Sequence, residues 1–192
     1  QKTKGDAEKL ILSKANPHVK ASIIRPSVIF GPNDKFINKF ANLIKIFNGL
    51  IPLACPNTLL QPIFVNDIVE AIIAIVEDPQ HNDPIYELGG PEVISLIDIV
   101  RYICQTLEIK DRVIPLNNMF STIQASLLEF VPGKPFSKDN LRSLKNDSVC
   151  SKHPGLTELG IKPTTMNEIV PKYLSSNTYK DRFAHYRNTS GR

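Results

Sequence analysis

The sequence is poor in cysteine, which argues against two kinds of stabilising site. Its three cysteines, Cys55, Cys104 and Cys150, are odd in number and form no Cys-x-x-Cys pair. This pattern suits neither a disulfide framework nor a zinc site, and it indicates a reducing compartment. Cys104 adjoins an apolar helical stripe and is predicted to lie in the core.

Paired histidines, long apolar runs and a glycine-rich loop are also lacking. The four histidines stand far apart, so no helical metal site is expected. The longest apolar run, Ala71 to Val76, is much shorter than the ~20 residues that cross a bilayer. No Gly-x-x-Gly-x-x-Gly loop is present to hold a pyrophosphate. The chain begins with Gln1, apparently inside a helix, so we interpret it as a fragment, and a targeting peptide upstream is left open.

Positive charge is concentrated at the C-terminus. The formal net charge is +4, of which residues 175–192 carry +3 and the rest of the chain +1. The body of the chain is therefore not a nucleic-acid surface. Because Tyr179, Phe183 and Tyr186 alternate with the tail's charges, the tail could contact an acidic partner or an anionic membrane surface, the alternative being a solvated, flexible end.

The order of the predicted elements indicates an α/β fold. With 192 residues and 42% hydrophobic content, the chain can bury one sizeable core. Patterns predict helices over 2–12, 34–49 and 68–76 and strands over 21–24, 63–65 and 85–88, and this alternation suits a mostly parallel sheet. In the first helix Lys4 and Ile11 share one face, so Lys4 is predicted to point inward.

Beyond Pro91 the pattern becomes mostly helical. Capping boxes at Ser95–Asp98 and Thr165–Glu168 predict two helix starts. A short strand is predicted over 113–116 and an amphipathic helix over 119–131, and Leu141 and Leu144 anchor another helix. Pro171 is expected to bend or shorten the last helix.

The segment from Ser22 to Asp34 is the most informative part of the sequence. Its β-rich run breaks at Arg25-Pro26 and again at Gly31-Pro32, just before a helix. Parallel strands deliver such loops to ligand crevices at their carboxyl ends. The alternative is an ordinary buried strand followed by a proline-rich turn.

Several residues near these loops have both a structural and a functional interpretation. Ser27 has no base beside it in the sequence and is predicted to be a loop hydroxyl that bonds backbone, not a nucleophile. Gln61 is either a structural amide or part of a substrate cleft. Asp67 is predicted to cap a helix rather than act as an acid. Gly89-Gly90 is predicted to be a turn that needs φ > 0.

Four blocks of sequence together carry a resemblance to a known family. Their order and spacing are a more specific signal than any single block. The four blocks are Lys4 with Glu8, Arg25 to Pro32, Gln61 to Asp67, and Tyr86 to Pro91. Together they resemble the C-terminal half of an extended or atypical short-chain dehydrogenase/reductase of the NAD-dependent epimerase/dehydratase superfamily. Segments 141–147, 159–163 and 169–174 carry a narrower resemblance to the branch that includes the nucleotide-binding accessory subunit of respiratory complex I and its bacterial relatives.

This resemblance implies a fold and three segments. Residues 1–90 would be the C-terminal part of a Rossmann-type doubly wound sheet. Residues 91–174 would form a small, mostly helical substrate lobe, and 175–192 a basic, flexible tail.

The resemblance also implies a cofactor, NADPH or NADH, in the complete protein. Lys4 matches the lysine of the family's Tyr-x-x-x-Lys motif, whose tyrosine position falls immediately before Gln1. In active members this lysine bonds the nicotinamide ribose and lowers the pKa of the tyrosine. Backbone groups of Pro26, Ser27 and Val28 would face the nicotinamide carboxamide, and Gln61 would lie toward the substrate.

Three functions remain open at this point. The first is an NAD(P)-binding, non-catalytic subunit or assembly factor of NADH:ubiquinone oxidoreductase, either cytoplasmic or on the mitochondrial matrix side and peripheral to the inner membrane. The second is an NAD(P)-dependent reductase, epimerase or dehydratase acting on a nucleotide sugar or isoprenoid-like substrate. The third is a truncated remnant or interaction module without a cofactor.

The expected partners are a missing N-terminal Rossmann half and subunits of complex I, with membrane-surface contact by the tail. Alone, the chain is expected to be inactive and to expose a sheet edge, together with the helix face of Phe36, Phe40 and Ile44.

Overall fold

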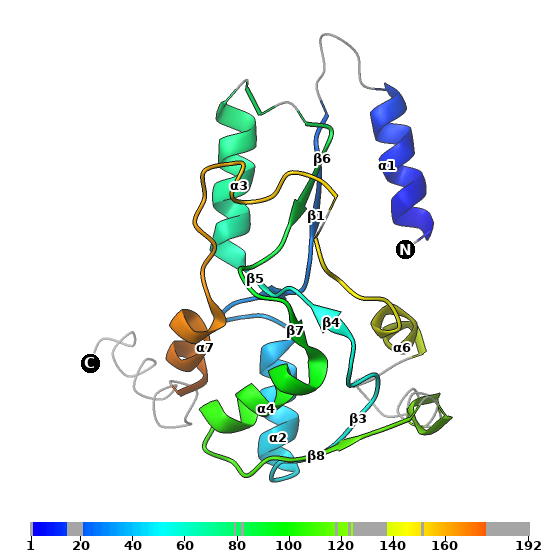
Figure 1. Ribbon diagram of the computed structural model, residues 1–192, viewed down its shortest axis with the longest axis vertical. Helices are drawn as coiled ribbons and strands as arrows, with labels where there is room; N and C mark the ends of the chain where they lie inside the picture. The colour runs from blue at the N-terminus through cyan, green and yellow to red at the C-terminus, as the bar shows by residue number, and fades with distance from the viewer. Residues whose placement is uncertain are drawn as a thin grey trace, which may run out of the picture.

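Figure 1 shows the computed structural model, which describes residues 2–14, 21–78, 80–81, 83–117, 119–122, 124, 138–150 and 152–175. The helices are α1 (Lys2–Lys14), α2 (Ile37–Ile46), α3 (Val65–Glu77), α4 (Leu96–Thr106), α6 (Lys138–Leu144) and α7 (Met166–Ser175). The strands are β1 (Ile23–Pro26), β2 (Ile29–Phe30), β3 (Leu50–Leu53), β4 (Leu59–Leu60), β5 (Ile63–Phe64), β6 (Ile85–Leu88), β7 (Ile94–Ser95) and β8 (Arg112–Pro115). The predicted tail beyond Ser175 lies outside the described residues, and the helix predicted over 119–131 is described, as helix, only at 119–122 and 124.

The strands pair mostly in parallel, which confirms the α/β class. β1 pairs with β6, β2 with β5 and β3 with β8, all in parallel, whereas β4 and β7 are antiparallel. Helices α1 and α3 stand on opposite sides of β1 and β6 (Figure 1). This is the arrangement of a doubly wound sheet with helices on both faces.

The predicted strand break at Arg25-Pro26 is wrong, because β1 continues through both residues. The backbone amides of Ile23 and Ser27 donate to carbonyls at and before β6, each at 2.9 Å. Amides at alternate positions therefore point toward β6, and the nitrogen of Pro26 faces the other edge. The proline costs this pairing no hydrogen bond.

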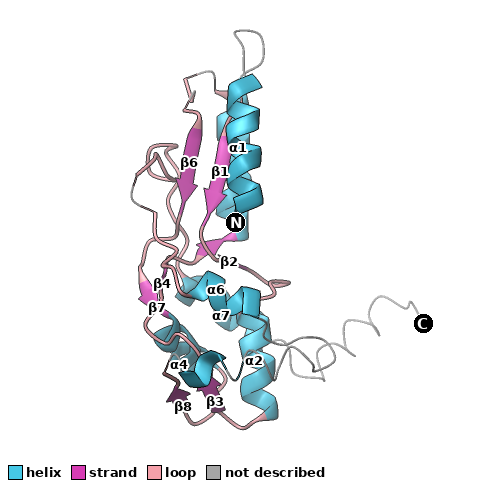
Figure 2. Cartoon of the chain, turned by 90° about the vertical axis from the view of Figure 1, so that its right-hand side faces the viewer, coloured by secondary structure: helices cyan, strands magenta, loops and turns pink. Residues whose placement is uncertain are grey.

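The two larger of three hydrophobic cores in the described residues lie one below the other along the molecule. The larger joins α2, α4 and α7 to β3, with Ile44, Val100 and Val170 fully buried. The smaller lies between α3 and β6, around Ile63 and Tyr86. Figure 2 shows α2, α4 and α7 gathered in the lower part and β1, β6 and α1 in the upper part. The larger core contains residues from both sides of position 90. The predicted division into segments 1–90, 91–174 and 175–192 remains a prediction.

The Asp34 carboxylate precedes α2 and bonds backbone amides at the start of this helix. Its Oδ1 accepts hydrogen bonds from the amides of Phe36 (2.7 Å) and Asn38 (3.2 Å). The expectation that the face of Phe36, Phe40 and Ile44 would be exposed in this chain is wrong. Ile44 is fully buried and both phenylalanines pack against the larger core, because α4 and α7 of the same chain cover this face.

The two predicted capping boxes lie at helix starts. The Asp98 amide donates to Ser95 Oγ (3.3 Å) at the start of α4, and the Thr165 amide donates to Glu168 Oε2 (3.2 Å) at the start of α7. Pro171 does not end α7, which continues to Ser175 with its apolar face in the larger core. In the part of the chain that is described, no helix is both long and apolar enough to cross a membrane.

Candidate functional site

The loops that follow β1 and β6 leave the same edge of the sheet. The parallel register runs from Ile23 opposite Ile85 to Pro26 opposite Leu88. It brings the start of the Ser27 loop beside Gly89 at the carboxyl ends of both strands. Ligand crevices of open α/β sheets form at this kind of edge.

Ser27 ties one of these loops to a distant segment. It is only 9% exposed, its Oγ donates to the Ser148 carbonyl at 2.6 Å, and the Gln61 amide donates to that Oγ at 3.2 Å. The hydroxyl therefore bonds backbone, as the sequence predicts. Because its proton is given to a carbonyl oxygen, Ser27 is not arranged as a nucleophile.

Gln61 joins two further segments through its side-chain amide. Its Nε2 donates to the Gly90 carbonyl at 2.7 Å, and its Oε1 accepts from the Cys150 amide at 2.9 Å. Among the described residues, no buried side-chain nitrogen or oxygen lacks a hydrogen-bond partner. This bonding matches the structural-amide interpretation of Gln61, and its role toward a substrate remains a prediction.

Gly89 and Gly90 are required for a different reason from the one predicted. Neither has φ in the left-handed region, so the prediction of a turn that needs φ > 0 is wrong. A Cβ on Gly90 would overlap the Pro62 carbonyl oxygen, and one on Gly89 would meet the Gln61 side-chain amide. Close approach of two chain segments explains both glycines.

Lys4 is the third residue of α1. The N-terminal end of this helix lies level with the carboxyl end of β1 in both views (Figures 1 and 2). Its side chain is exposed, and Ile11 on the same face is 50% exposed. The predicted inward orientation of Lys4 is therefore wrong for this chain, because no described element covers that face. Lys4 and the Pro26 to Val28 loop nevertheless share one end of the sheet.

An ion pair holds α1 against β1. Arg25 donates twice to Glu8, from Nη2 to Oε2 at 2.6 Å and from Nε to Oε1 at 3.2 Å, and its Nη1 lies 3.8 Å from Glu87 Oε1. The hydrogen bond from Arg25 holds the pKa of Glu8 below its ordinary value. Because Glu8 is one helical turn from Lys4, this bidentate pair fixes the helix that carries Lys4.

Asp67 joins the two cores instead of capping α3. It is 3% exposed, and its carboxylate accepts hydrogen bonds from the amide and the hydroxyl of Thr164, both at 2.7 Å. The prediction of a cap is wrong, since α3 begins at Val65 and no side chain caps it. The carboxylate is committed to the segment that leads into α7.

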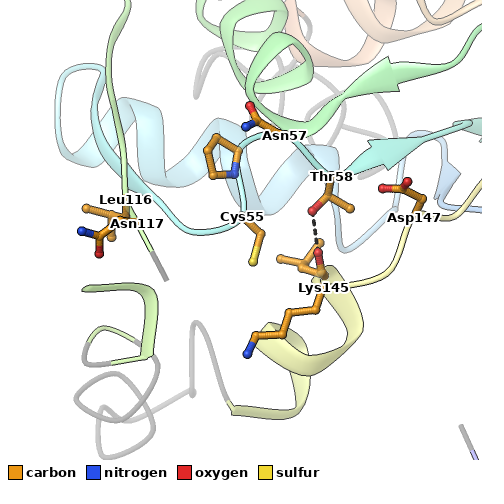
Figure 3. Close-up of a pocket in the computed structure, with 9 residues that line it drawn as sticks. Cys55, Asn57, Thr58, Leu116, Asn117, Lys145 and Asp147 are labelled. Carbon is orange, nitrogen blue, oxygen red and sulfur yellow. Dashed lines mark hydrogen bonds between the residues drawn. The ribbon is translucent and has the colours of Figure 1, made fainter. Parts of the chain in front are cut away.

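A pocket of about 650 Å³ was not foreseen from the sequence. Figure 3 shows its walls, which come from residues 55–58, 116–117, 144–145 and 147. Thr58 Oγ1 donates to the Leu144 carbonyl (2.5 Å) across one side. Burial raises the pKa of the Cys55 thiol although Lys145 opposes this shift, so the thiol is protonated near neutral pH and is a weak nucleophile. The pocket is built from three segments that lie far apart in the sequence, so no local pattern predicts it.

Comparison with known proteins shows similarity to one family and to solved structures of the same fold. Residues 1–90 match the model of the 3-beta hydroxysteroid dehydrogenase/isomerase family. The fold is similar to that of a UDP-glucose 4-epimerase from Thermotoga maritima (TM-score 0.57, 12% identity, 97% of this chain and 52% of that one). It is also similar to DesIV, a dTDP-glucose 4,6-dehydratase from Streptomyces venezuelae with NAD and TYD bound (TM-score 0.55, 14% identity, 82% and 44%). Residues 1–90 are thus similar to this family, and the chain shares the fold of an NAD-binding dehydratase and a sugar epimerase, as the sequence predicts.

The chain is also similar to a particular mitochondrial protein. It is 30% identical over 151 residues to the mouse protein NADH dehydrogenase [ubiquinone] 1 alpha subcomplex subunit 9, mitochondrial. The match covers 77% of this chain and 40% of the mouse protein. The chain thus spans about two fifths of the length of this relative.

Proposed function

We propose that the chain is the C-terminal part of an NAD(P)-binding, non-catalytic subunit or assembly factor of NADH:ubiquinone oxidoreductase. The observation that carries this proposal is the 30% identity to the mouse complex I subunit over 151 residues. The match extends beyond residue 90, where the family model ends, so it rests on both parts of the chain.

The cofactor of the complete protein is NADPH or NADH, and the residues at the edge of β1 fit its nicotinamide end. Lys4 is exposed at that edge and can donate to a ribose hydroxyl. Pro26 is exposed, and its loop is held rigidly by the bonds of Ser27 and Gln61. In this proposal the backbone of Pro26, Ser27 and Val28 receives the carboxamide, while Gln61 lies toward the substrate.

The first partner proposed is an N-terminal Rossmann half. Within the described residues, β1 has a strand neighbour, β6, on one edge alone. Helix α3 leaves Val69, Ile72 and Val76 exposed by 49%, 44% and 78% at helical spacing. An added strand and helix beside β1 would cover both surfaces.

The further proposed partners are complex I subunits on the matrix side of the inner membrane, with the basic tail at the membrane surface. The relatives' mitochondrial names and the tail's charge of +3 support this placement.

A second function, an NAD(P)-dependent epimerase, dehydratase or reductase on a nucleotide sugar or isoprenoid-like substrate, is favoured by the fold shared with DesIV and the Thermotoga epimerase. It requires a tyrosine immediately before Gln1, because that tyrosine would transfer the proton.

The test is titration of the complete protein with NADPH and with NADH by calorimetry. Lys4→Ala should weaken binding about 10- to 100-fold, the loss of one charged hydrogen bond. Lys9→Ala is the matched control, since Lys9 is an exposed lysine of the same helix. Binding without turnover, and migration with NADH:ubiquinone oxidoreductase on native gels, are expected. Substrate-dependent oxidation would instead establish the enzyme, and no binding would leave the interaction module.

A further inference from the structure

One end of the molecule carries a cluster of exposed apolar side chains, here called the tip patch: Ile46, Phe47, Leu50 and Ile114. Their exposed fractions are 71%, 55%, 47% and 50%. Both views place the C-terminal end of α2 together with β3 and β8 at this lower end, away from the edge where β1 ends (Figures 1 and 2).

The backbone explains why these side chains share a surface. In the parallel register of β3 and β8, Leu50 lies opposite Arg112 and Pro52 opposite Ile114. All four are exposed, while Ile51 and Leu53, which alternate with them, are buried. These exposed side chains therefore occupy the outer face of the two-stranded sheet.

The turn after α2 continues the same surface. The Leu50 amide donates to the Phe47 carbonyl (3.1 Å), and the Arg112 amide donates to the Gly49 carbonyl (3.2 Å). Ile46 is two residues beyond the buried Ile44, so it points away from the core. The tip patch thus exposes large apolar side chains to solvent, and these side chains do not pack in either core.

The charges around the tip patch are mostly positive. Lys45, Lys110 and Arg112 are exposed beside it. Of the acidic residues nearby, Glu108 is exposed, and Asp111 is paired with Arg101, whose Nε lies 3.2 Å from Asp111 Oδ2. From Lys35 to Asn66 the sequence contains three lysines and no acidic residue. Charge complementarity therefore favours an anionic occupant.

We propose that the tip patch docks on an anionic phospholipid surface, with Ile46 and Phe47 inserted among the lipids and Lys45, Lys110 and Arg112 at the headgroups. Large apolar side chains bordered by lysine and arginine are the combination by which proteins lie on membranes without crossing them. The proposal concerns residues 45–50 and 110–114, is independent of nucleotide binding, and does not involve the tail.

The experiment is flotation of the complete protein with vesicles of phosphatidylcholine, with and without about 30 mol% phosphatidylserine. Binding is expected with the anionic vesicles and should weaken in high salt. The double variant Ile46→Ser/Phe47→Ser should reduce the partition coefficient at least tenfold (~1.4 kcal/mol), and Lys45→Glu about fivefold or more. All these side chains are exposed, so thermal melting should match that of the parent protein.

The matched controls make the same kinds of substitution at exposed positions outside the tip patch. Val93→Ser deletes an apolar side chain that is 49% exposed, and Lys152→Glu reverses an exposed charge. Both variants, and a protein ending at Ser175, should bind vesicles like the parent.

The proposal would be overturned if the protein did not bind anionic vesicles, or if the control variants lost as much vesicle binding as the tip-patch variants. It would also be overturned if removal of the tail alone abolished vesicle binding, or if a tip-patch variant released a protein subunit yet kept its vesicle binding.

Discussion

Replacing Asp67 with alanine would show how strongly the two cores are tied together. The buried carboxylate accepts two hydrogen bonds of 2.7 Å from Thr164. Each hydrogen bond to a charged group contributes about 1.5–3 kcal/mol, and two from one residue are not additive. We therefore expect Asp67→Ala to lower the free energy of unfolding by about 3 kcal/mol. The assay is urea unfolding of the complete protein, followed by circular dichroism.

Asp98 provides the matched control. Asp67 and Asp98 are each the third residue of a helix, α3 and α4 respectively, so both interact with a helix N-terminus. The Asp98 side chain is 59% exposed, and we expect Asp98→Ala to cost less than about 1 kcal/mol. If the two variants lost the same free energy of unfolding, the hydrogen bonds between Asp67 and Thr164 would not contribute measurably to stability.

A double-mutant cycle sharpens this test. Thr164→Ala removes the hydroxyl donor but leaves the backbone amide, so the coupling energy with Asp67→Ala isolates the hydroxyl contact. We expect a coupling of about 1 kcal/mol. Simple additivity of the two losses would refute a direct interaction.

Three further predictions use other parts of the structure. Gly90→Ala should abolish soluble expression or cost more than about 3 kcal/mol, because its Cβ would overlap a backbone carbonyl, whereas Gly89→Ala meets a movable side chain and should cost less in the same unfolding assay. Burial raises the pKa of Cys150 to about 11, so iodoacetamide should modify this thiol slowly near pH 8 and faster toward pH 11, measured by mass spectrometry. The pKa of Glu8 is lower in the folded state than in the unfolded state, so its pairing with Arg25 stabilises α1 above the ordinary carboxyl pKa and is lost as the pH falls through the lowered value. Amide protection factors in α1, which are corrected for the pH dependence of intrinsic exchange, should therefore fall at low pH, and Arg25→Ala should remove that fall.

Local patterns predicted those elements whose signals lie within one segment. β6 was predicted at Ile85–Leu88 and is found there, because its apolar run is bounded by turn residues. α4 begins after Ser95 as its capping box predicts. β3, β4 and β7 were missed because strands of two to four residues depend on partners far along the chain.

The site was less predictable because its contacts are not local. The bond between Ser27 and Ser148 spans 121 residues of sequence, and no pattern around either serine indicates it. Asp67 shows the same limit, since Asn66-Asp67 before an apolar run looks like a helix cap. Burial against Thr164, 97 residues later, decides its role instead.

The upper part of the structure leaves three surfaces open on which the proposed N-terminal half would pack. Lys4 is exposed on α1, β1 has an open edge among the described strands, and α3 exposes Ile72 and Val76. In the lower part the exposed apolar side chains are those of the tip patch, whereas the core residues Ile44 and Val170 are fully buried. If the proposed N-terminal half covers the three upper surfaces, its removal should weaken the upper core first. In the isolated chain, hydrogen exchange should then be fast in α1 and α3 and slow in α4, and uniform protection in a monomeric chain would show that no further layer is needed.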